Sequence, residues 1–251
     1  MTEVSAVSKL LGFELLPLQT RLDTIDVALG WRPAARVLIP IYGEIEAFAA
    51  KVLESGCMIS VGRGVKLQRR VSATQCIDWF ESLPVAGGTH GLGLERMSIL
   101  YIGRSETEAE QARAADESGD DESFGRALGY PRCCMSFVRN RSRVPSIAEC
   151  FELYASDGFY EPWTWPCTLQ FDAGLIPHFP CSSSCGDSRI LAEQRWNLLR
   201  EAGRSTDIDR LRRARRGKYF LATDNTVGRV DPDGQVPSSA SATALPTGEF
   251  P

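Results

Sequence analysis

The residues of this chain that are best suited to chemistry, by their type and spacing, lie in two short cysteine motifs. The first is GYPRCC, which ends in Cys133 and Cys134, and the second is HFPCSSSC, which contains Cys181 and Cys185. A cysteine thiolate is both a nucleophile and a ligand for soft metal ions. Cysteines clustered in this way therefore indicate a metal site, an iron–sulfur cluster or thiol chemistry.

Both motifs fall at the starts of predicted helices. Pro131 suits the first turn of a helix, which puts Cys133 and Cys134 within that turn. Cys185 comes directly before a helix that we expect to begin near Gly186. Free N–H groups and the positive end of the helix dipole stabilise anionic sulfur at such positions. Two helix starts that meet at one point would favour thiolates, a metal ion or an anionic cluster.

The spacing of the cysteines predicts the number of ligands but leaves the metal open. If residues 181–185 form a helical turn, Cys181 and Cys185 face the same way. Adjacent side chains diverge, so we expect only one of Cys133 and Cys134 to join them. Three thiolates with an open fourth position suit either a catalytic zinc ion or an iron–sulfur cluster with one exposed iron. Thiolates exclude magnesium and calcium as natural occupants.

His178 and Asp172 are the candidate catalytic residues beside this site. His178 stands three residues before Cys181, where its imidazole would either fill the fourth coordination position or carry protons. Together with Asp172 it would orient or protonate a substrate bound at the open position. Residues 163–179 are irregular and rich in proline and aromatic residues, and we expect the exposed face of the metal to look towards them.

The remaining cysteines stand alone in the sequence. We interpret them as small residues of the core, which is the commonest place for free cysteine. They are Cys57, Cys76, Cys150 and Cys167. A disulfide between the two motifs is a further alternative, although stable disulfides are rare in a reducing cytosol.

Composition bounds the class of protein. The chain has 251 residues, a formal net charge of −4, 43% hydrophobic and 24% charged residues, so its charge favours neither nucleic acid nor an anionic membrane. No apolar run reaches the roughly 20 residues that span a bilayer. The N-terminus lacks a basic segment followed by an apolar one, so we expect a cytoplasmic protein without a signal peptide. The arginine-rich run at residues 210–218 predicts a solvated helix end in preference to a nucleic-acid contact.

Strand and helix patterns alternate in the first half of the chain, which indicates an α/β or α+β layer. The predicted strands are residues 36–42, 57–62, 65–71 and 97–105. The predicted helices are residues 18–31, 43–55, 74–83, capped by Thr74, and 105–118, capped by Ser105 or Thr107.

Helices dominate the second half. We predict them at residues 120–130, 131–141, 145–158, 186–203 and 206–217, followed by a hairpin at 218–231 that turns at Asp224 and Asn225. The expected fold is a small mixed sheet with helices, followed by a helix-rich half that bears the cysteines. We expect four segments: an N-terminal helical segment (1–31), a mixed α/β layer (32–118), a helical cysteine-motif region packed on it (119–235) and a disordered tail (236–251).

Residues 97–200 resemble a domain of unknown function that occurs in archaea and in some bacteria. Its pattern is a strand ending in YIG, an acidic helix, LGYPxCC with a following phenylalanine, and HFPCSxxC with a following serine. The matching positions are residues 101–103, 128–134 with Phe137, and 178–185 with Ser188. The resemblance implies that the two cysteine motifs form one site, and it implies no particular reaction.

Three functions follow from these patterns. The first is a metal- or cluster-dependent enzyme that polarises a small-molecule substrate at an open coordination position. The second is a non-enzymatic module in which zinc only holds helices together and the arginine-rich helix binds RNA or a protein. The third is a sulfur-transfer enzyme with Cys133 or Cys134 as nucleophile.

Overall fold

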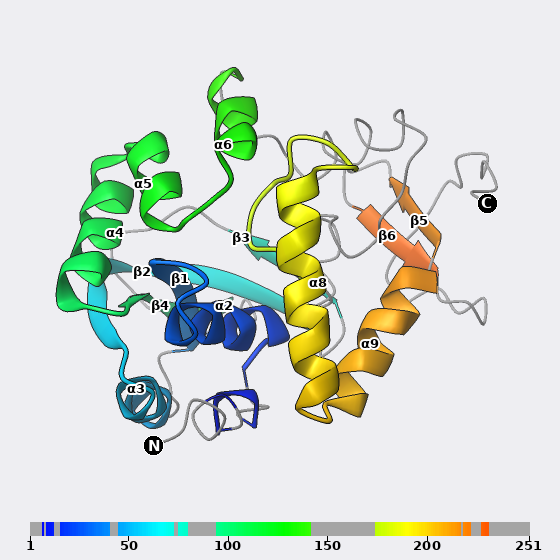
Figure 1. Ribbon diagram of the computed structural model, residues 1–251, viewed down its shortest axis with the longest axis horizontal. Coiled ribbons are helices and arrows are strands. Elements are labelled where there is room, and N and C mark those ends of the chain that lie inside the picture. The colour runs from blue at the N-terminus through cyan, green and yellow to red at the C-terminus, as the bar shows by residue number, and fades with distance from the viewer. Residues whose placement is uncertain are drawn as a thin grey trace. The chain divides into compact units, whose positions relative to one another are not determined.

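The computed structural model divides the chain into two compact units, Met1–Arg139 and Asn140–Pro251 (Figure 1). The structure describes residues 7, 9–12, 16–40, 45–72, 75–79, 94–141, 174–216, 218–221 and 227–230. The elements of the first unit are α2 (Leu18–Ala28), β1 (Ala34–Pro40), α3 (Ile45–Glu54), β2 (Met58–Ser72), β3 (Gln75–Trp79), β4 (Leu94–Gly103), α4 (Glu106–Ser118), α5 (Asp121–Ala127) and α6 (Arg132–Arg139). Those of the second unit are α8 (Gly186–Glu201), α9 (Ser205–Arg216), β5 (Lys218–Leu221) and β6 (Val227–Val230).

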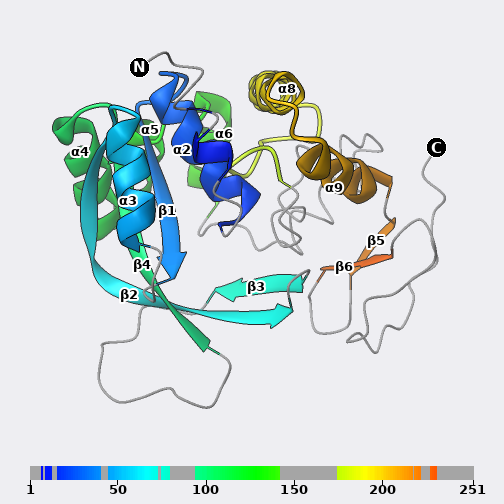
Figure 2. The same cartoon turned by 90° about the horizontal axis from the view of Figure 1, so that it is seen from below.

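The strands of the first unit form one sheet in the order β1-β4-β2-β3. All of the described pairings are antiparallel, with β4 between β1 and β2. The register of β2 against β4 shifts between Val61 and Val65. Beyond this irregularity β2 bends and continues to its pairing with β3 (Figure 2). The expected combination of a small sheet with helices is confirmed.

One face of the sheet holds the core beneath α4 and α5. The register places Leu38 opposite Ile99, and these two side chains therefore share a face. The buried cluster on this face consists of Ala34, Leu38, Met97, Ile99, Tyr101, Ala112 and Leu128. Tyr101 donates a hydrogen bond to the carboxylate of Asp116 in α4. Burial raises the pKa of the Tyr101 hydroxyl, and the nearby Asp116 raises it further.

The opposite face of the sheet is also buried. Its residues are Ala35, Val37, Ile39, Leu100 and Ile102. The helices α2 and α3 contact the sheet, and we assign them to this face because α4 and α5 cover the other one. Burial of Leu22, Ile25, Phe48 and Val52 from these helices stabilises the layer by about 1.5–3 kcal/mol for each side chain.

Helix α4 begins as the sequence predicts. Ser105 is its N-cap: the Ser105 hydroxyl accepts from the Glu108 backbone N–H, and the Glu108 carboxylate accepts from the Ser105 N–H. This capping box satisfies two donors that a helix start otherwise leaves free. The choice of Ser105 over Thr107 as cap is therefore settled.

The predicted helix over residues 74–83 is wrong. Residues Gln75–Trp79 form strand β3, which pairs antiparallel with β2. The run contains Ile77 and Trp79, which fit a pleated strand well, and the exposed edge of β2 provides the hydrogen-bonding partner. The two short strands predicted at 57–62 and 65–71 are parts of one long strand, β2, which pairs with β4 on both sides of its irregularity.

The second unit contains a helical pair and a hairpin. Helix α8 is followed by α9, and the Arg212 guanidinium of α9 lies 6.0 Å from the centre of the Trp196 ring in α8. Strands β5 and β6 pair antiparallel, which confirms the predicted hairpin, although its turn lies outside the described residues. The predicted helix at 145–158 and the tail at 236–251 also lie outside them. The division into four segments stays a prediction.

Among the helices that the structure describes, we find none long and apolar enough to cross a membrane.

Candidate metal centre

Cys133 and Cys134 lie in the first turn of α6, where the sequence predicts them. The helix begins after Pro131, whose carbonyl accepts a hydrogen bond from the Met135 N–H at 3.0 Å. Cys133 is exposed and Cys134 is buried, yet their sulfur atoms lie only 3.8 Å apart. The two thiols are thus close enough to bind one ion.

A tight turn between α5 and α6 positions Cys133 and Cys134. Gly129 has a φ of +70°, a left-handed conformation that side-chain-bearing residues rarely adopt. The N–H of Gly129 donates to the Arg126 carbonyl, and the N–H of Tyr130 donates to the Gly125 carbonyl at 2.9 Å. These bonds end α5 and direct the chain into α6 within a few residues.

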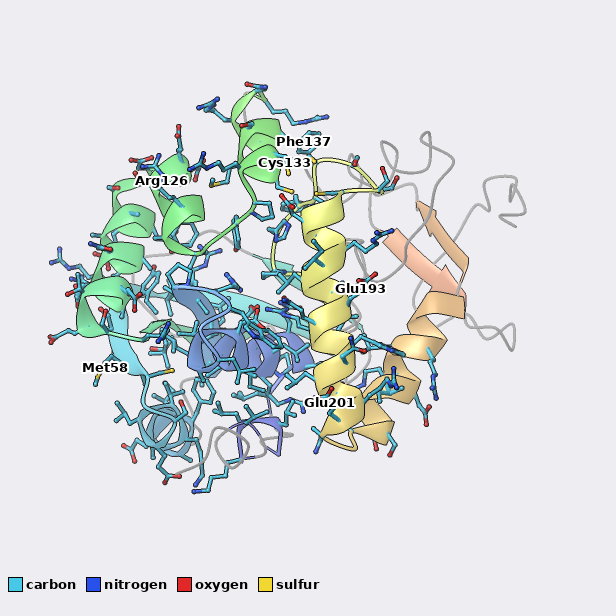
Figure 3. All side chains as sticks on the ribbon, viewed as in Figure 1. Met58, Arg126, Cys133, Phe137, Glu193 and Glu201 are labelled. Atoms are coloured by element: carbon cyan, nitrogen blue, oxygen red, sulfur yellow. The ribbon has the colours of Figure 1, made fainter. Side chains whose placement is uncertain are left out.

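Cys133 also shares a side of α6 with Phe137, one turn further along (Figure 3).

Cys181 and Cys185 lie in a turn that precedes α8. The N–H of Cys185 donates to the Ser182 carbonyl at 3.2 Å, and Cys185 is the N-cap residue of α8. The prediction that Cys185 stands directly before a helix is confirmed. Residues 181–185 themselves are not helical, so the helical spacing considered for this pair does not apply.

Two side chains of α8 fasten the segment that leads to this turn. Ser188 is fully buried, and its hydroxyl lies 2.8 Å from Nε2 of His178. Arg195 is also fully buried and donates from Nη1 to the Leu175 carbonyl at 3.1 Å. The two contacts are spaced by two helical turns on the buried face of α8, and they hold Leu175 and His178 at the start of the segment.

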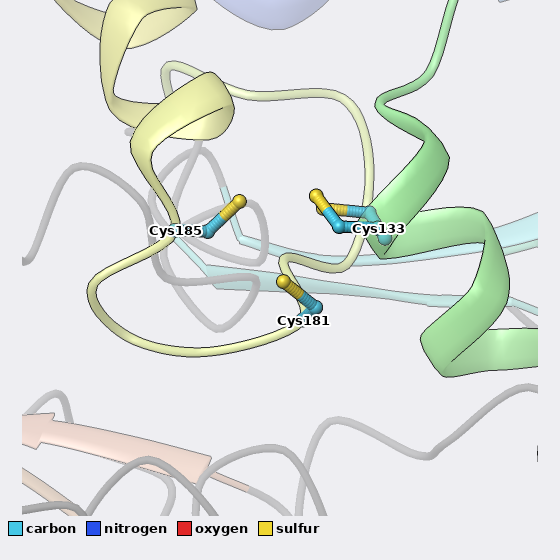
Figure 4. A group of neighbouring side chains, drawn as sticks. Cys133, Cys181 and Cys185 are labelled. Atoms are coloured by element: carbon cyan, nitrogen blue, oxygen red, sulfur yellow. The ribbon is translucent and has the colours of Figure 1, made fainter.

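The four cysteines form one group. The sulfur atoms of Cys133, Cys134, Cys181 and Cys185 all lie within 4.8 Å of one another. Figure 4 shows the side chains of Cys133, Cys181 and Cys185 pointing towards one another. In a tetrahedral zinc–thiolate site the Zn–S distance of about 2.3 Å separates the sulfurs by roughly 3.8 Å. Small adjustments of the four side chains would therefore let this group hold a metal ion.

Comparisons with known proteins give little beyond this geometry. No family model matches the chain, and no solved structure matches it. An uncharacterised protein of Methanothermobacter thermautotrophicus is 34% identical over 74 residues, which are 28% of this chain. The match covers 35% of that protein, so the chain spans about a third of the length of this relative. The finding is consistent with the resemblance to an uncharacterised family.

The structure corrects one expectation about the ligands. We expected the adjacent side chains of Cys133 and Cys134 to diverge, and this is wrong, because both sulfurs belong to the group. His178 does not belong to it, and its Nε2 faces Ser188 instead. Within the described residues, the group therefore consists of four thiols and no imidazole or carboxylate.

Other residues singled out in the sequence fall elsewhere. Asp172, Cys150 and Cys167 lie outside the described residues, as does the side chain of Cys76. Cys57 is buried away from the group, and burial raises the pKa of its thiol. Its environment fits the core role that the sequence predicts.

The supporting residues Arg195 and Gly129 were missed in the sequence. Arg195 stands seven residues after Ser188, so the two fall on one face of the predicted helix, and this spacing could have indicated its role. Gly129 directly precedes the motif at a helix end, where a left-handed glycine is common.

Proposed function

We propose that this protein binds one thiophilic metal ion, zinc in the first place, through the thiolates of Cys133, Cys134, Cys181 and Cys185. The observation that carries the proposal is the mutual distance of the four sulfurs, at most 4.8 Å. Four thiolates around one point suit zinc or iron and exclude magnesium and calcium. A site with four protein ligands and no open position is typical of structural zinc.

The distances favour a single ion over a multi-iron cluster. The 3.8 Å between the sulfurs of Cys133 and Cys134 equals the spacing of two thiolates on one tetrahedral ion. In a four-iron cluster each thiolate binds a different iron, and the sulfurs must then stand further apart than they do here. A cluster would require the group to open, whereas a zinc ion would require it to contract slightly.

The chemical role of such an ion is to join two segments that are distant in sequence. The first segment is the start of α6, and the second is the turn before α8. Metal binding to thiolates from distant segments contributes directly to the free energy of folding. Reduced thiols are required for this role, which fits the cytoplasmic location that the sequence favours.

Metal and sulfide analysis of protein purified without oxygen tests the proposal. We expect about one zinc per chain and no acid-labile sulfide, since structural zinc sites bind one ion through four protein ligands. Stoichiometric iron with acid-labile sulfide would show that the cysteines bind an iron–sulfur cluster and not zinc. Protein that takes up neither metal after reduction and reconstitution would refute a metal site altogether.

The exposure of Cys133 favours a second candidate, chemistry at sulfur. Its three partners are half-buried or buried, so Cys133 is the ligand in this group that a dissolved electrophile reaches most easily. A substrate could displace this thiolate from the metal, or the thiolate could attack the outer sulfur of a sulfane-sulfur donor, which forms a Cys133 persulfide and releases the rest of the donor as an anion. Limited treatment with iodoacetamide, followed by peptide mass spectrometry, tests this. Modification of Cys133 before the buried Cys57 supports it, and equal rates for the two refute it.

A further inference from the structure

We propose that Arg32 is the positioning residue of this metal site, acting through the turn that precedes Cys133 and Cys134. The inference rests on the proposed function, because it concerns how the first pair of ligands is held. Arg32 lies nearly one hundred positions before that turn in the sequence, and no motif connects the two.

The side chain of Arg32 contacts the turn directly. Arg32 is 4% exposed, and its Nε donates to the carbonyl of Leu128 at 2.8 Å. The same guanidinium lies 5.3 Å from the centre of the Tyr130 ring, within the range of a cation–π contact. One planar group therefore holds the residues on both sides of Gly129.

Two buried carboxylates fix the guanidinium in that position. Nη1 of Arg32 donates to Asp23 at 3.1 Å and lies 3.9 Å from Asp26, and both aspartates belong to α2. Asp26 is fully buried, and Asp23 is nearly so. A buried ion pair has a narrow range of acceptable geometry, because each charge loses its hydration and depends on its partner. The orientation of Arg32 is thus set by α2.

The ring of Pro33, the residue after Arg32, packs closely against the same turn. A Cβ atom added at Gly129 would lie 2.8 Å from Cδ of Pro33, closer than real Cβ contacts come. The left-handed φ of Gly129 and this close approach both require glycine. Arg32 and Pro33 therefore pack against one side of the turn and restrict its conformation.

The consequence for the metal site is geometric. The turn is followed at once by Pro131 and by the first turn of α6, which carries both thiols. A displacement of the Leu128 carbonyl therefore moves the start of α6 and the two sulfurs with it. Removal of a contact that orients a metal ligand typically lowers the metal affinity by about 10–100-fold.

Lysine cannot replace arginine in this role. Arg32 uses separate nitrogens for Leu128 and Asp23, and its flat face for Tyr130. A lysine keeps the charge but offers a single nitrogen and no planar face. Arg32→Lys should therefore keep the ion pair with α2 and lose the contacts with Leu128 and Tyr130 in the turn.

Two matched pairs of variants test the inference through cobalt(II) binding to the whole chain, followed by the thiolate-to-cobalt absorption. The first pair is Gly129→Ala and Gly119→Ala. Gly119 has a φ of +71° at the end of α4, and nothing lies within 4 Å of a Cβ added there. Both substitutions strain a left-handed glycine, but only Gly129 belongs to the turn before the cysteines.

The second pair is Arg32→Lys and Arg36→Lys. Arg36 also binds an aspartate, Asp116 at 3.0 Å, and lies 4.9 Å from the centre of an aromatic ring, that of Phe124. It makes the same kinds of contact without touching the turn at Gly129. This pair serves if Gly129→Ala does not fold.

We expect Gly129→Ala and Arg32→Lys to weaken cobalt binding by about ten-fold or more, with an altered absorption spectrum. Gly119→Ala and Arg36→Lys should change the affinity by less than about two-fold, because they act at sites without shared partners. Equal weakening within each pair, with normal binding by the unmodified protein, overturns this inference alone. Absence of cobalt and zinc binding by the unmodified protein overturns the proposed function and this inference with it.

Discussion

Cys133 and Cys134 stand in a regular helix, whereas Cys181 and Cys185 stand in a turn that only leads into one. The first pair follows a left-handed glycine turn and lies in α6, and Arg32 and Tyr130 hold that turn. The second pair depends on a segment that two side chains of α8 fasten, Ser188 and Arg195.

This contrast indicates how the two pairs would respond to a metal. Backbone hydrogen bonds and the buried charges of Arg32, Asp23 and Asp26 hold the turn that leads to the first pair. An irregular segment opens locally at a lower free energy than a packed helix does. We therefore expect the metal to order the second pair and to find the first pair already in place.

The largest effect should come from loss of a buried ligand. Cys185→Ser should lower the metal content from about one ion per chain to near zero, and it should lower the melting temperature to that of chelator-treated protein. Metal analysis and thermal unfolding measure both quantities.

Cys57→Ser is the matched control, since Cys57 is equally buried but outside the group. It should keep the metal and cost about 1 kcal/mol of stability. Equal losses of melting temperature in the two variants, with the metal retained, would mean that burial alone explains the cysteines.

Hydrogen exchange with and without chelator should separate the two regions. We expect removal of the metal to speed exchange in residues 174–185 by about a hundred-fold, the change that corresponds to a ligand at a hundred times its Kd. Exchange in α6 and in the turn before it should rise by less than about ten-fold. Equal acceleration in both regions would contradict the comparison, because the first pair would then depend on the metal as much as the second.

Ser188→Ala should weaken the hold on the second pair alone. It removes the hydroxyl next to Nε2 of His178 in a buried place, which costs about 1–3 kcal/mol. Zinc affinity, measured by competition with a chromophoric chelator, should fall by about ten-fold. Ser184→Ala, at an exposed position in the same turn, should change the affinity by less than about two-fold. A normal zinc affinity in Ser188→Ala would show that this contact does not position the turn.

Much of this arrangement could be predicted from the sequence. Ser105 and Glu108 stand at the spacing of a capping box, and the prolines before both cysteine pairs mark helix starts or turns correctly. These signals are local, so they survive folding. The strand at Gln75–Trp79 was missed because its partner β2, and not its own helix propensity, decides its structure.

The parts of the site that escaped prediction depend on contacts between distant residues. The positions of the Cys133 and Cys134 side chains depend on the direction in which α6 continues from the turn before it. The general rule that neighbouring side chains diverge does not predict how close their sulfurs lie. Arg32 reaches the same turn from the other end of the first unit. Neither a motif nor a periodicity records such a contact.

The smallest expected effect is a loss of stability at alkaline pH, and it concerns only the first unit, which contains Tyr101. The pKa of Tyr101 is raised by burial and by Asp116, so the folded state holds this proton more tightly than the unfolded state. The stability that the protonated hydroxyl supplies is complete below about pH 10 and is lost as the pH rises through the folded pKa.

Tyr101→Phe should remove this part of the pH dependence and cost about 1 kcal/mol at neutral pH, with Asp116 still bound to Arg36. Urea unfolding at about pH 8 and about pH 11 measures it. Residues 174–185 contain no tyrosine, and their hydrogen exchange should be the same in both proteins once corrected for pH. An identical loss of stability at high pH in the variant and the unmodified protein would assign the effect to other groups.

X-ray absorption at the metal edge tests the central claim most directly, because it counts the atoms bound to the ion. For protein purified with its metal we predict four sulfur neighbours at about 2.3 Å around zinc, with no second metal nearby. Three sulfurs and a nitrogen or oxygen would contradict the closed four-thiolate site, and a neighbouring iron would replace it by a cluster.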